Sequence, residues 1–366
     1  MTVIEPEWGT HLEFPSSRSS AQLTHIVGGR YPCRSVAAVP RLLLAASFQH
    51  GATGKTVLDP FMGSGTTALE SILAGHHVIG LEVDPYARMI ASATAHVYKR
   101  SELVRLDRFA AEVTKRFKEV RFSRRFIPDL ENIDYWFPKE NIIALARIRR
   151  LIEETFPHWT TDKQLVLAAF GDIIRAASYA ERQSLKPYIS KRFPKIPGDP
   201  LTLFDSTLLK YIAAAKDLST STIHAAVSFE WASGDASSFV LKDQVDVAIT
   251  SPPYINAMDY VRCIRLESSW VGTANASTLK ATRNVQIGEG ARVVDARPSQ
   301  VVDEVIKLYT TGIGAVDATR ARIVAAYFQD MYENIRSVRD ALRNGASYYL
   351  IVGNSVVRGV EVPTHE

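Results

Sequence analysis

One short stretch of the chain combines a stiff backbone, a hydroxyl group and an aromatic ring at the end of an apolar run. Residues 250–260 read TSPPYINAMDY and follow the apolar run VDVAIT. Two adjacent prolines donate no ladder hydrogen bonds, so a strand must end here. The Ser251 hydroxyl and the Pro252 carbonyl can accept hydrogen bonds, and the Tyr254 ring can stack on a planar group. The stretch is either a stiff strand-to-loop turn or a clamp for a flat, polar substrate.

A glycine-rich turn occurs where another predicted strand passes into a helix. The sequence LDPFMGSGTT occupies residues 58–67, and Gly63 and Gly65 allow backbone conformations that other residues avoid. The start of the following helix offers unpaired N–H groups to a ligand. Glu82 follows roughly 20 residues later near a strand end, where a carboxylate can accept hydrogen bonds from ribose hydroxyls. This spacing favours a nucleoside-containing cofactor over a purely structural turn.

The nearby sequence GATGKT does not fit a phosphate-binding loop. Such a loop needs a glycine five positions before Gly54, where this chain has Gln49. It should also follow a strand and open a helix, whereas here it precedes the strand. A nucleoside triphosphatase is therefore disfavoured.

The two motifs require elements that bring them to one edge of a sheet. Residues 56–99 read as strand, glycine-rich turn, helix, strand and helix, a βαβα unit that predicts a parallel sheet. Strand-like pattern returns at 227–236 and 244–254, and the chain closes with a helix over 323–342, a turn at RNGA and a strand at SYYLIVGN. We predict an α/β protein with a doubly wound, mostly parallel sheet.

The segment between the two halves of this sheet has a different character. Residues 100–222 follow long helical patterns rich in Arg and Lys, and the Gly, Ala and Thr-rich residues 273–318 predict a long loop or a small subdomain. The predicted parts are an N-terminal part at 1–99, a helical insertion at 100–225 and a C-terminal part at 226–366.

Composition bounds the class of protein. The chain has 366 residues, of which 46% are hydrophobic and 22% charged, enough to bury a globular core. Its apolar runs are shorter than the roughly 20 residues of a membrane span, and the N-terminus lacks a signal pattern, so we expect a cytoplasmic protein. Cys33 and Cys263 have no metal-ligand spacing, which argues against zinc and against a disulfide framework. The net charge of +4 is compatible with nucleic acid but does not require it.

The glycine-rich motif and the SPPY motif together resemble those of a known family. DPFMGSGTT followed downstream by TSPPY resembles the motif pair of the S-adenosylmethionine-dependent DNA amino-methyltransferases, which methylate exocyclic amines. RYPCR near Tyr31, SGDAS around Asp235 and YYLIVGNS resemble three further stretches of that family. The resemblance covers residues 25–98 and 228–358. It implies a Rossmann-like class I methyltransferase fold, and leaves open whether the C-terminal edge of the sheet is missing.

The resemblance also implies roles for individual residues. The Ser251 hydroxyl and the Pro252 carbonyl would hold the target amine, and Pro253 would fix the direction of the Pro252 carbonyl. Tyr254 would stack on the base once it leaves the duplex. Cofactor-binding roles are expected for Tyr31, Asp59, Phe61, Gly63, Gly65, Thr66, Glu82 and Asp235. S-adenosyl-L-methionine is the expected cofactor, and no metal is expected. Ordinary packing or capping roles stay open for several of these residues.

Serine before the two prolines goes mostly with N4-cytosine in the family, and aspartate or asparagine mostly with N6-adenine. We therefore expect a cytosine-N4 DNA methyltransferase of a restriction-modification or phage-defence system. An adenine-N6 enzyme, an RNA amino-methyltransferase and a catalytically silent DNA-binding subunit are the alternatives. Ring-carbon cytosine methylation is disfavoured, because no Pro-Cys pair occupies the catalytic position.

The insertion carries candidate contacts to double-stranded DNA. Tyr188 and Phe193 are interleaved with cations in one loop, and such clusters supply phosphate contacts. The predicted DNA-binding residues are Lys186, Lys191, Arg192 and Lys195. A second basic run at 115–125 fits a solvated helix face equally well.

Two features depart from the family pattern. The insertion follows the second strand and precedes the acidic turn at Asp235, so recognition would be shared between the insertion and residues 273–318. The chain also stops 13 residues after Gly353, where relatives continue with a helix and an antiparallel strand pair. We expect either a shorter sheet or a complementing C-terminal chain, besides a cognate restriction endonuclease as partner.

Overall fold

The protein folds around a five-stranded parallel sheet. The computed structural model describes residues 23–29, 31–48, 52–221, 227–255, 259–288 and 300–364, so the expectations for residues 1–22 fall outside it. The strands are β1 (Thr56–Asp59), β2 (His77–Gly80), β3 (Phe229–Trp231), β4 (Val245–Thr250) and β5 (Leu342–Leu350). Their order is β3-β2-β1-β4-β5, and every neighbouring pair is parallel. The predicted mostly parallel α/β fold is confirmed.

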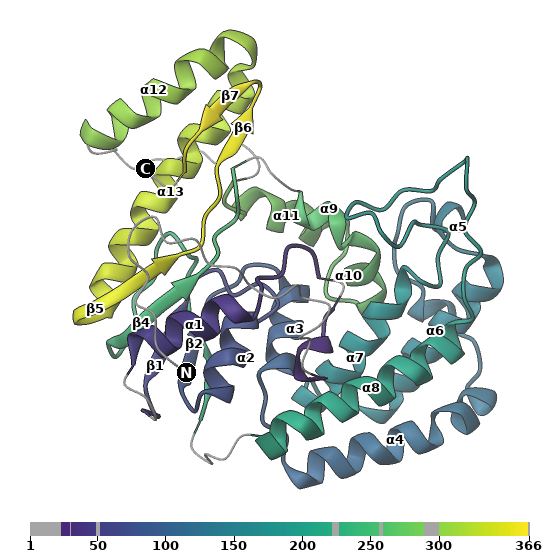
Figure 1. Cartoon of the computed structure of the whole chain (residues 1–366). Coiled ribbons are helices and arrows are strands. Elements are labelled where there is room, and N and C mark those ends of the chain that lie inside the picture. Colours follow the sequence, from purple (N-terminus) through teal and green to yellow (C-terminus); the bar gives the residue numbers. More distant parts are fainter. Residues whose placement is uncertain are drawn as a thin grey trace.

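Helices cover both faces of the sheet, as alternation along the strands requires. Val57 of β1 and Val247 of β4 pack with Leu44 of α1 (Ala38–Ser47), whereas Leu58 of β1 packs with Val338 of α13 (Ala318–Ala341) on the other face. The sheet is therefore doubly wound, and Figure 1 shows α1 and α13 beside it.

Two more helices complete the first half of the sheet. α2 (Thr66–Leu73) follows the glycine-rich turn, and α3 (Pro85–Thr94) follows β2. Asp84 caps α3 by accepting hydrogen bonds from the N–H groups of Tyr86 (2.8 Å) and Ala87 (3.0 Å), and Pro85 occupies the first helical position.

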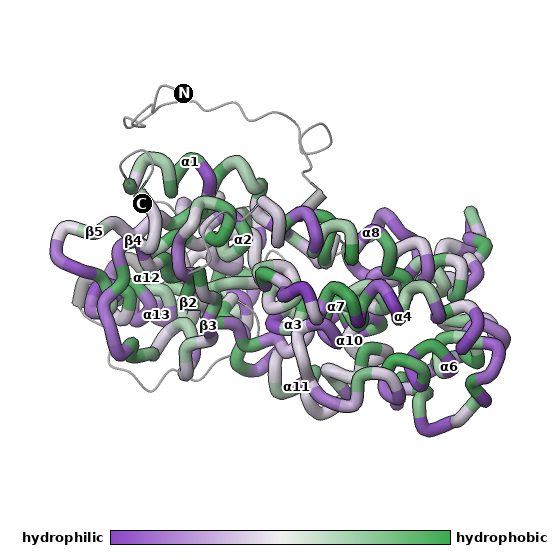
Figure 2. Tube along the Cα trace, turned by 90° about the horizontal axis from the view of Figure 1, so that it is seen from below, coloured by the Kyte–Doolittle hydropathy of each residue, from purple (hydrophilic) through white to green (hydrophobic). Residues whose placement is uncertain are grey.

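The helical insertion lies between β2 and β3 along the chain. Its elements are α4 (Arg100–Glu119), η2 (Arg124–Phe126), α5 (Ile133–Trp136), α6 (Lys139–Thr155), α7 (Thr161–Ile174) and α8 (Pro200–Ser221). Helix α7 is almost wholly buried and lies against α3, where Gly171 allows the approach: a Cβ there would lie 2.5 Å from the Tyr86 hydroxyl oxygen. Figures 1 and 2 show the sheet at one end of the molecule and the insertion at the other.

The segment that begins at Leu23 connects the insertion with the part of the molecule that contains the sheet. The short η1 (Leu23–Ile26) contacts α8, and the Gly28 N–H donates to the Tyr211 hydroxyl at 2.9 Å. This segment leads directly to Tyr31, so the insertion helps to fix the position of that residue.

The C-terminal part differs from expectation in two places. Residues 273–318 contain α11 (Ala276–Val285) and α12 (Gln300–Val316), so a long loop is the wrong reading for their described portions. The RNGA stretch lies inside the bounds of β5, which begins at Leu342, but it does not pair with β4. Leu342 lies opposite Val245 and Ser347 opposite Val247, so residues 343–346 bulge out between two paired parts of the strand, and Gly345 takes a left-handed φ of 79°. The local turn signal is therefore found as a bulge within β5 and not as a turn before it.

The remaining elements surround the end of the sheet. α9 (Tyr260–Cys263) and α10 (Arg265–Val271) follow the SPPY turn, and β6 (Ser355–Val357) pairs antiparallel with β7 (Val360–Val362) as a separate two-stranded sheet. Val357 and Val362 pack with α13 in one hydrophobic cluster. Among the described helices, none has the length and apolarity that a bilayer span needs.

Candidate active site

A pocket lies at the carboxyl ends of β1, β2 and β4. Its walls come from the glycine-rich turn after β1, residues 81–83 after β2, Ser251 and Pro253 after β4, and residues 31–35, 235–236 and 285–287, with Tyr260. In the strand order, β2 lies on one side of β1 and β4 on the other. This is the switch point of a doubly wound sheet, where ligands bind.

Asp59, the last residue of β1, is buried beneath this pocket. Its carboxylate accepts hydrogen bonds from the Phe61 N–H (3.0 Å) and the Thr250 hydroxyl (2.5 Å). Burial raises its pKa to about 6, while the bonds from Thr250, Thr67 and Phe61 oppose the rise. Asp59 thus both lines the pocket and holds the turn, so the binding and capping interpretations of this residue are compatible.

The two glycines of the turn have different surroundings. Gly63 lines the pocket with φ 51°, and its N–H donates to Glu82 Oε2 at 2.9 Å. Gly65 has φ 85° and faces away from the pocket, since a Cβ there would lie 3.0 Å from Cα and Cβ of Ala91 in α3. Thr66 of this turn lines the pocket, whereas Gly65 is not among the described residues that line it. Gly65 acts through close packing of α2 on α3.

Glu82 joins the glycine-rich turn to the segment after β2. Its Oε1 accepts from the Asp84 N–H at 2.8 Å, and its Oε2 accepts from Gly63. Burial, followed by the charge of Asp84, raises the pKa of Glu82 to about 7, and the backbone donors oppose this. Near neutral pH the carboxyl is therefore poised between its two forms, and a ligand that donates hydrogen bonds to it favours the ionised one.

The side chains of the SPPY turn differ in their contacts and in their burial. The Ser251 hydroxyl donates to the Ile351 carbonyl at 3.2 Å, which leaves the oxygen lone pairs as acceptors. Pro253 lines the pocket and Pro252 is buried beside it. The half-exposed Tyr254 ring lies against Gly353, where a Cβ would be 3.6 Å from Tyr254 Cε2.

The other predicted cofactor residues also reach the pocket. Tyr31 lies across from Gly63, with 3.7 Å between its Cε1 and a Cβ built there, and Phe61 lines the wall. Asp235 lines it too, and its Oδ1 accepts from both the N–H (2.8 Å) and the hydroxyl (2.5 Å) of Ser237.

Sequence reasoning missed part of the wall. Tyr260 and Cys33 both line the pocket, and their side chains are hydrogen-bonded to each other. Residues 285–287 line it from the end of α11. Burial raises the pKa of Tyr260 and of Cys33. Cys33 has a left-handed φ of 53°, rare outside glycine. In the sequence, the one sign that Cys33 lies at the pocket is that it directly follows Tyr31 and Pro32 in the RYPCR stretch.

The predicted DNA-contacting cations divide into two groups. Lys186, Lys191 and Arg192 are exposed. Lys195, in contrast, donates to three backbone carbonyls, those of Arg175 (2.5 Å), Ser178 (2.7 Å) and Ala180 (2.8 Å). An ammonium has three hydrogens to donate, so we reassign Lys195 to an internal structural role. Within the described ranges, no group of three or more His, Cys, Asp or Glu side chains is arranged to hold a metal ion.

Comparisons with known proteins agree with this geometry. Residues 8–92 match the DNA methylase family N6_N4_Mtase. The chain is 23% identical to the type II methyltransferase M.MvaI of Kocuria varians, across 91% of this chain and 78% of that relative. It is 24% identical to M.BsoBI of Geobacillus stearothermophilus, across 64% of this chain and 50% of the relative. It is 22% identical to M.AvaI of Nostoc sp., across 84% and 70%. No solved structure matches the chain significantly.

Proposed function

We propose, on the premise that the chain is a member of the amino-methyltransferase family, that it transfers a methyl group from S-adenosyl-L-methionine to the exocyclic N4 of cytosine in duplex DNA. One observation carries the proposal. Asp59, Gly63 and Glu82 line the same pocket as Ser251 and Pro253, so the proposed donor and amine sites would share one cavity.

The pocket residues fit the cofactor. Glu82 would accept hydrogen bonds from the ribose hydroxyls beside the one it accepts from Gly63, and Asp59 is a further acceptor below the glycine-rich turn. The sulfonium would supply an electrophilic methyl group. Phe61 and Tyr31 provide apolar walls, and Asp235 is the proposed acceptor for the adenine amine.

The SPPY turn fits the nucleophile. The lone pair of an aromatic amine is delocalised into its ring, so the amine attacks poorly. Acceptors at Ser251 Oγ and the Pro252 carbonyl would bind the two amine hydrogens and favour a pyramidal nitrogen. The hydrogen bond from Ser251 to Ile351 supports this assignment, because it directs the hydroxyl hydrogen away from the amine. Tyr254 would stack on the extruded base.

The remaining parts receive roles by position. Residues 1–99 are the proposed cofactor half, 226–366 the target-base half, and 100–225 the proposed DNA-recognition region, in which Lys186, Lys191 and Arg192 contact phosphates. The choice of cytosine over adenine rests on Ser251, the serine before the two prolines. Restriction-modification is the proposed setting, with a cognate endonuclease as partner.

Isotope transfer tests the proposal. The protein is incubated with labelled S-adenosylmethionine and duplex DNA. The DNA is then digested, and the methylated nucleoside is identified by mass spectrometry. We expect N4-methylcytosine. N6-methyladenine would select the adenine alternative, label in RNA alone would select the RNA enzyme, and no transfer with intact DNA binding would select the silent subunit.

A further inference from the structure

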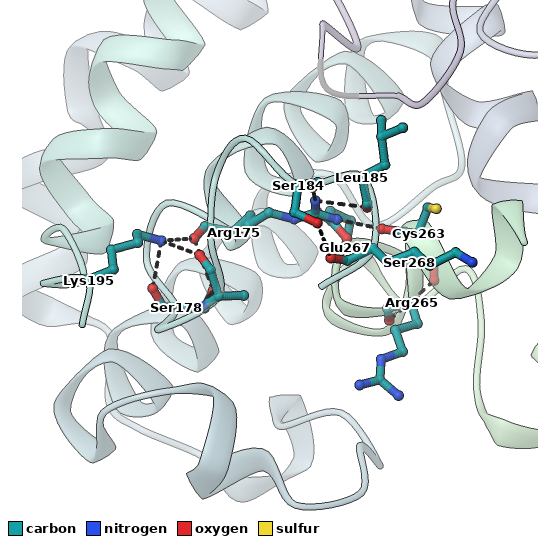
Figure 3. Close-up of polar contacts among 11 residues, drawn as sticks. Arg175, Ser178, Ser184, Leu185, Lys195, Cys263, Arg265, Glu267 and Ser268 are labelled. Atoms are coloured by element: carbon teal, nitrogen blue, oxygen red, sulfur yellow. Dashed lines mark hydrogen bonds and ion pairs between the residues drawn. The ribbon is translucent and has the colours of Figure 1, made fainter. Parts of the chain in front are cut away.

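One buried arginine joins two segments that are far apart in the sequence, the loop after α7 and the consecutive helices α9 and α10. Arg175 follows α7, and its Nε donates to Glu267 Oε1 of α10 at 3.0 Å. One terminal nitrogen donates to the carbonyls of Ser184 (2.6 Å) and Leu185 (3.1 Å), and the other to the Cys263 carbonyl (2.5 Å). Figure 3 shows these contacts around the guanidinium. Arg175 and Glu267 are both more than nine-tenths buried.

The first of these segments carries the exposed cations. We call residues 182–196 the basic loop. Arg175 holds its beginning, and Lys195 holds its end through the three carbonyls after α7 (Figure 3). Between the two attachments Lys186, Lys191 and Arg192 are exposed, and the Phe193 ring is 69% exposed. Both ends are fixed to one short stretch of backbone, so the loop follows any movement of that stretch.

The second segment belongs to the wall of the active site. Cys263 ends α9, and Tyr260, which begins that helix, lines the pocket. A second cavity is lined both by Tyr31 and Cys33 of the pocket wall and by Arg175 and Leu185. The pocket wall and the start of the basic loop thus contribute to one cavity, and the Arg175 guanidinium bonds to both the loop and α9.

The geometry points to Arg175 as a positioning residue for the methyl-transfer reaction: it sets the basic loop, and the DNA held by it, relative to the active-site wall. This inference rests on the proposed function. A guanidinium suits the task, since its planar fork serves four acceptors in fixed directions, whereas an ammonium on a flexible stem cannot reproduce them. Arg175 does not line the active-site pocket, so we expect its effect to pass through the position of the loop.

A double-mutant cycle tests this path. The value of kcat/KM for duplex DNA is measured for the unaltered protein, Arg175→Lys, Lys191→Ala with Arg192→Ala, and all three changes together. We expect Arg175→Lys to lower kcat/KM about tenfold with an unchanged Kd for S-adenosylmethionine, and to have no further effect once the loop cations are gone. Effects that multiply, or a weakened cofactor Kd, would overturn the inference.

Matched controls separate positioning from general damage. Arg265→Lys changes another arginine beside this network; its guanidinium lies over the Trp136 ring at 4.8 Å, and kcat/KM should stay unchanged. Glu267→Gln keeps the shape of the partner, and it should show the same non-additivity if Arg175→Lys fails to fold. An unaltered protein that methylates no DNA refutes the proposed function, whereas an active one with multiplicative effects refutes only the role of Arg175.

Discussion

Thr250, the last residue of β4, donates its hydroxyl hydrogen to the carboxylate of Asp59, the last residue of β1. The two residues are 191 positions apart, and each is the first residue of one of the two motifs, DPFMGSGTT and TSPPY. The glycine-rich turn and the SPPY turn are thus joined by a hydrogen bond where they leave their strands, so strand pairing alone does not set their separation.

Loss of this bond should weaken cofactor binding. Thr250→Val keeps the shape and removes the donor, so the pKa of Asp59 should rise above about 6. We expect Kd for S-adenosylmethionine at pH 7.5 to increase about tenfold, as for a hydrogen bond to a charged group. Isothermal titration calorimetry measures it.

Thr94→Val is the matched control for that change. Thr94 is buried in α3, and its Oγ1 has no hydrogen-bond partner in the described part of the chain. Its replacement should leave Kd unchanged. Equal effects of the two substitutions would show that the loss of a buried hydroxyl, rather than the bond to Asp59, is responsible.

Cofactor affinity should depend on the ionisation of Glu82. Ribose hydroxyls donate hydrogen bonds, so they favour the carboxylate, and affinity should rise severalfold as pH increases through about 7. Binding at pH 7 should release a proton, detected by calorimetry in buffers of different ionisation enthalpy. Glu82→Gln should remove the change near pH 7 and leave the one due to Asp59 near pH 6.

The unliganded protein should show the opposite trend in stability. The folded-state pKa of Glu82 is raised from 4.5 to about 7, so its stabilising contribution is full below the unfolded value and is lost as pH rises through 7. The melting temperature without cofactor should fall between pH 5 and pH 8, and less steeply in Glu82→Gln. An identical slope in both proteins would contradict the assigned pKa.

Removal of the proposed amine acceptor should affect turnover and spare cofactor binding. Ser251→Ala should lower kcat by about a hundredfold, within the range for a preorganised hydrogen bond in a transition state. Ser71→Ala is the control, since that buried hydroxyl also donates to a carbonyl, at 2.8 Å, but lies outside the pocket. A Kd for S-adenosylmethionine that rises with Ser251→Ala would argue against the assigned role.

Close packing at Gly65 should be measurable apart from its backbone angle. Gly65→Ala forces a Cβ against Ala91, whereas at Gly54, with φ 69°, no described heavy atom lies within 4 Å of such a Cβ. Both substitutions carry a left-handed penalty of about 1 kcal/mol. Gly65→Ala should cost about 1–3 kcal/mol more in free energy of unfolding, measured by urea denaturation. Equal losses would place the cost in the backbone alone.

Salt dependence should identify the cations that contact DNA. Lys191→Ala and Arg192→Ala should each reduce the slope of log K against log salt by about 0.9 per lost phosphate contact. Lys195→Ala should lower the melting temperature, because three carbonyls lose their donor, and should leave the slope unchanged. A reduced slope in Lys195→Ala alone would reverse the assignment.

Local signals made the parallel sheet and the two motifs predictable. A glycine with positive φ, a proline pair and alternating apolar residues depend on near neighbours in the sequence, so Asp59, Gly63, Ser251 and Pro253 could be placed from the chain alone. Tyr260 and residues 285–287 reach the pocket through the packing of α9 and α11, which no local pattern encodes. Lys195 shows the same limit, because counting charges does not separate a solvated cation from one bound to carbonyls.

The hydrophobic cluster shared between α3 and the insertion has a consequence for changing specificity. Met89 and Ile90 of α3 pack in one cluster with Leu167 and Phe170 of α7. Exchanging residues 100–225 for the corresponding segment of a relative would remove the apolar packing partners of α3, so this region is not an interchangeable module. Under the proposed function, new target preferences would be sought by substitutions at exposed positions of the insertion, which leave the common interior intact.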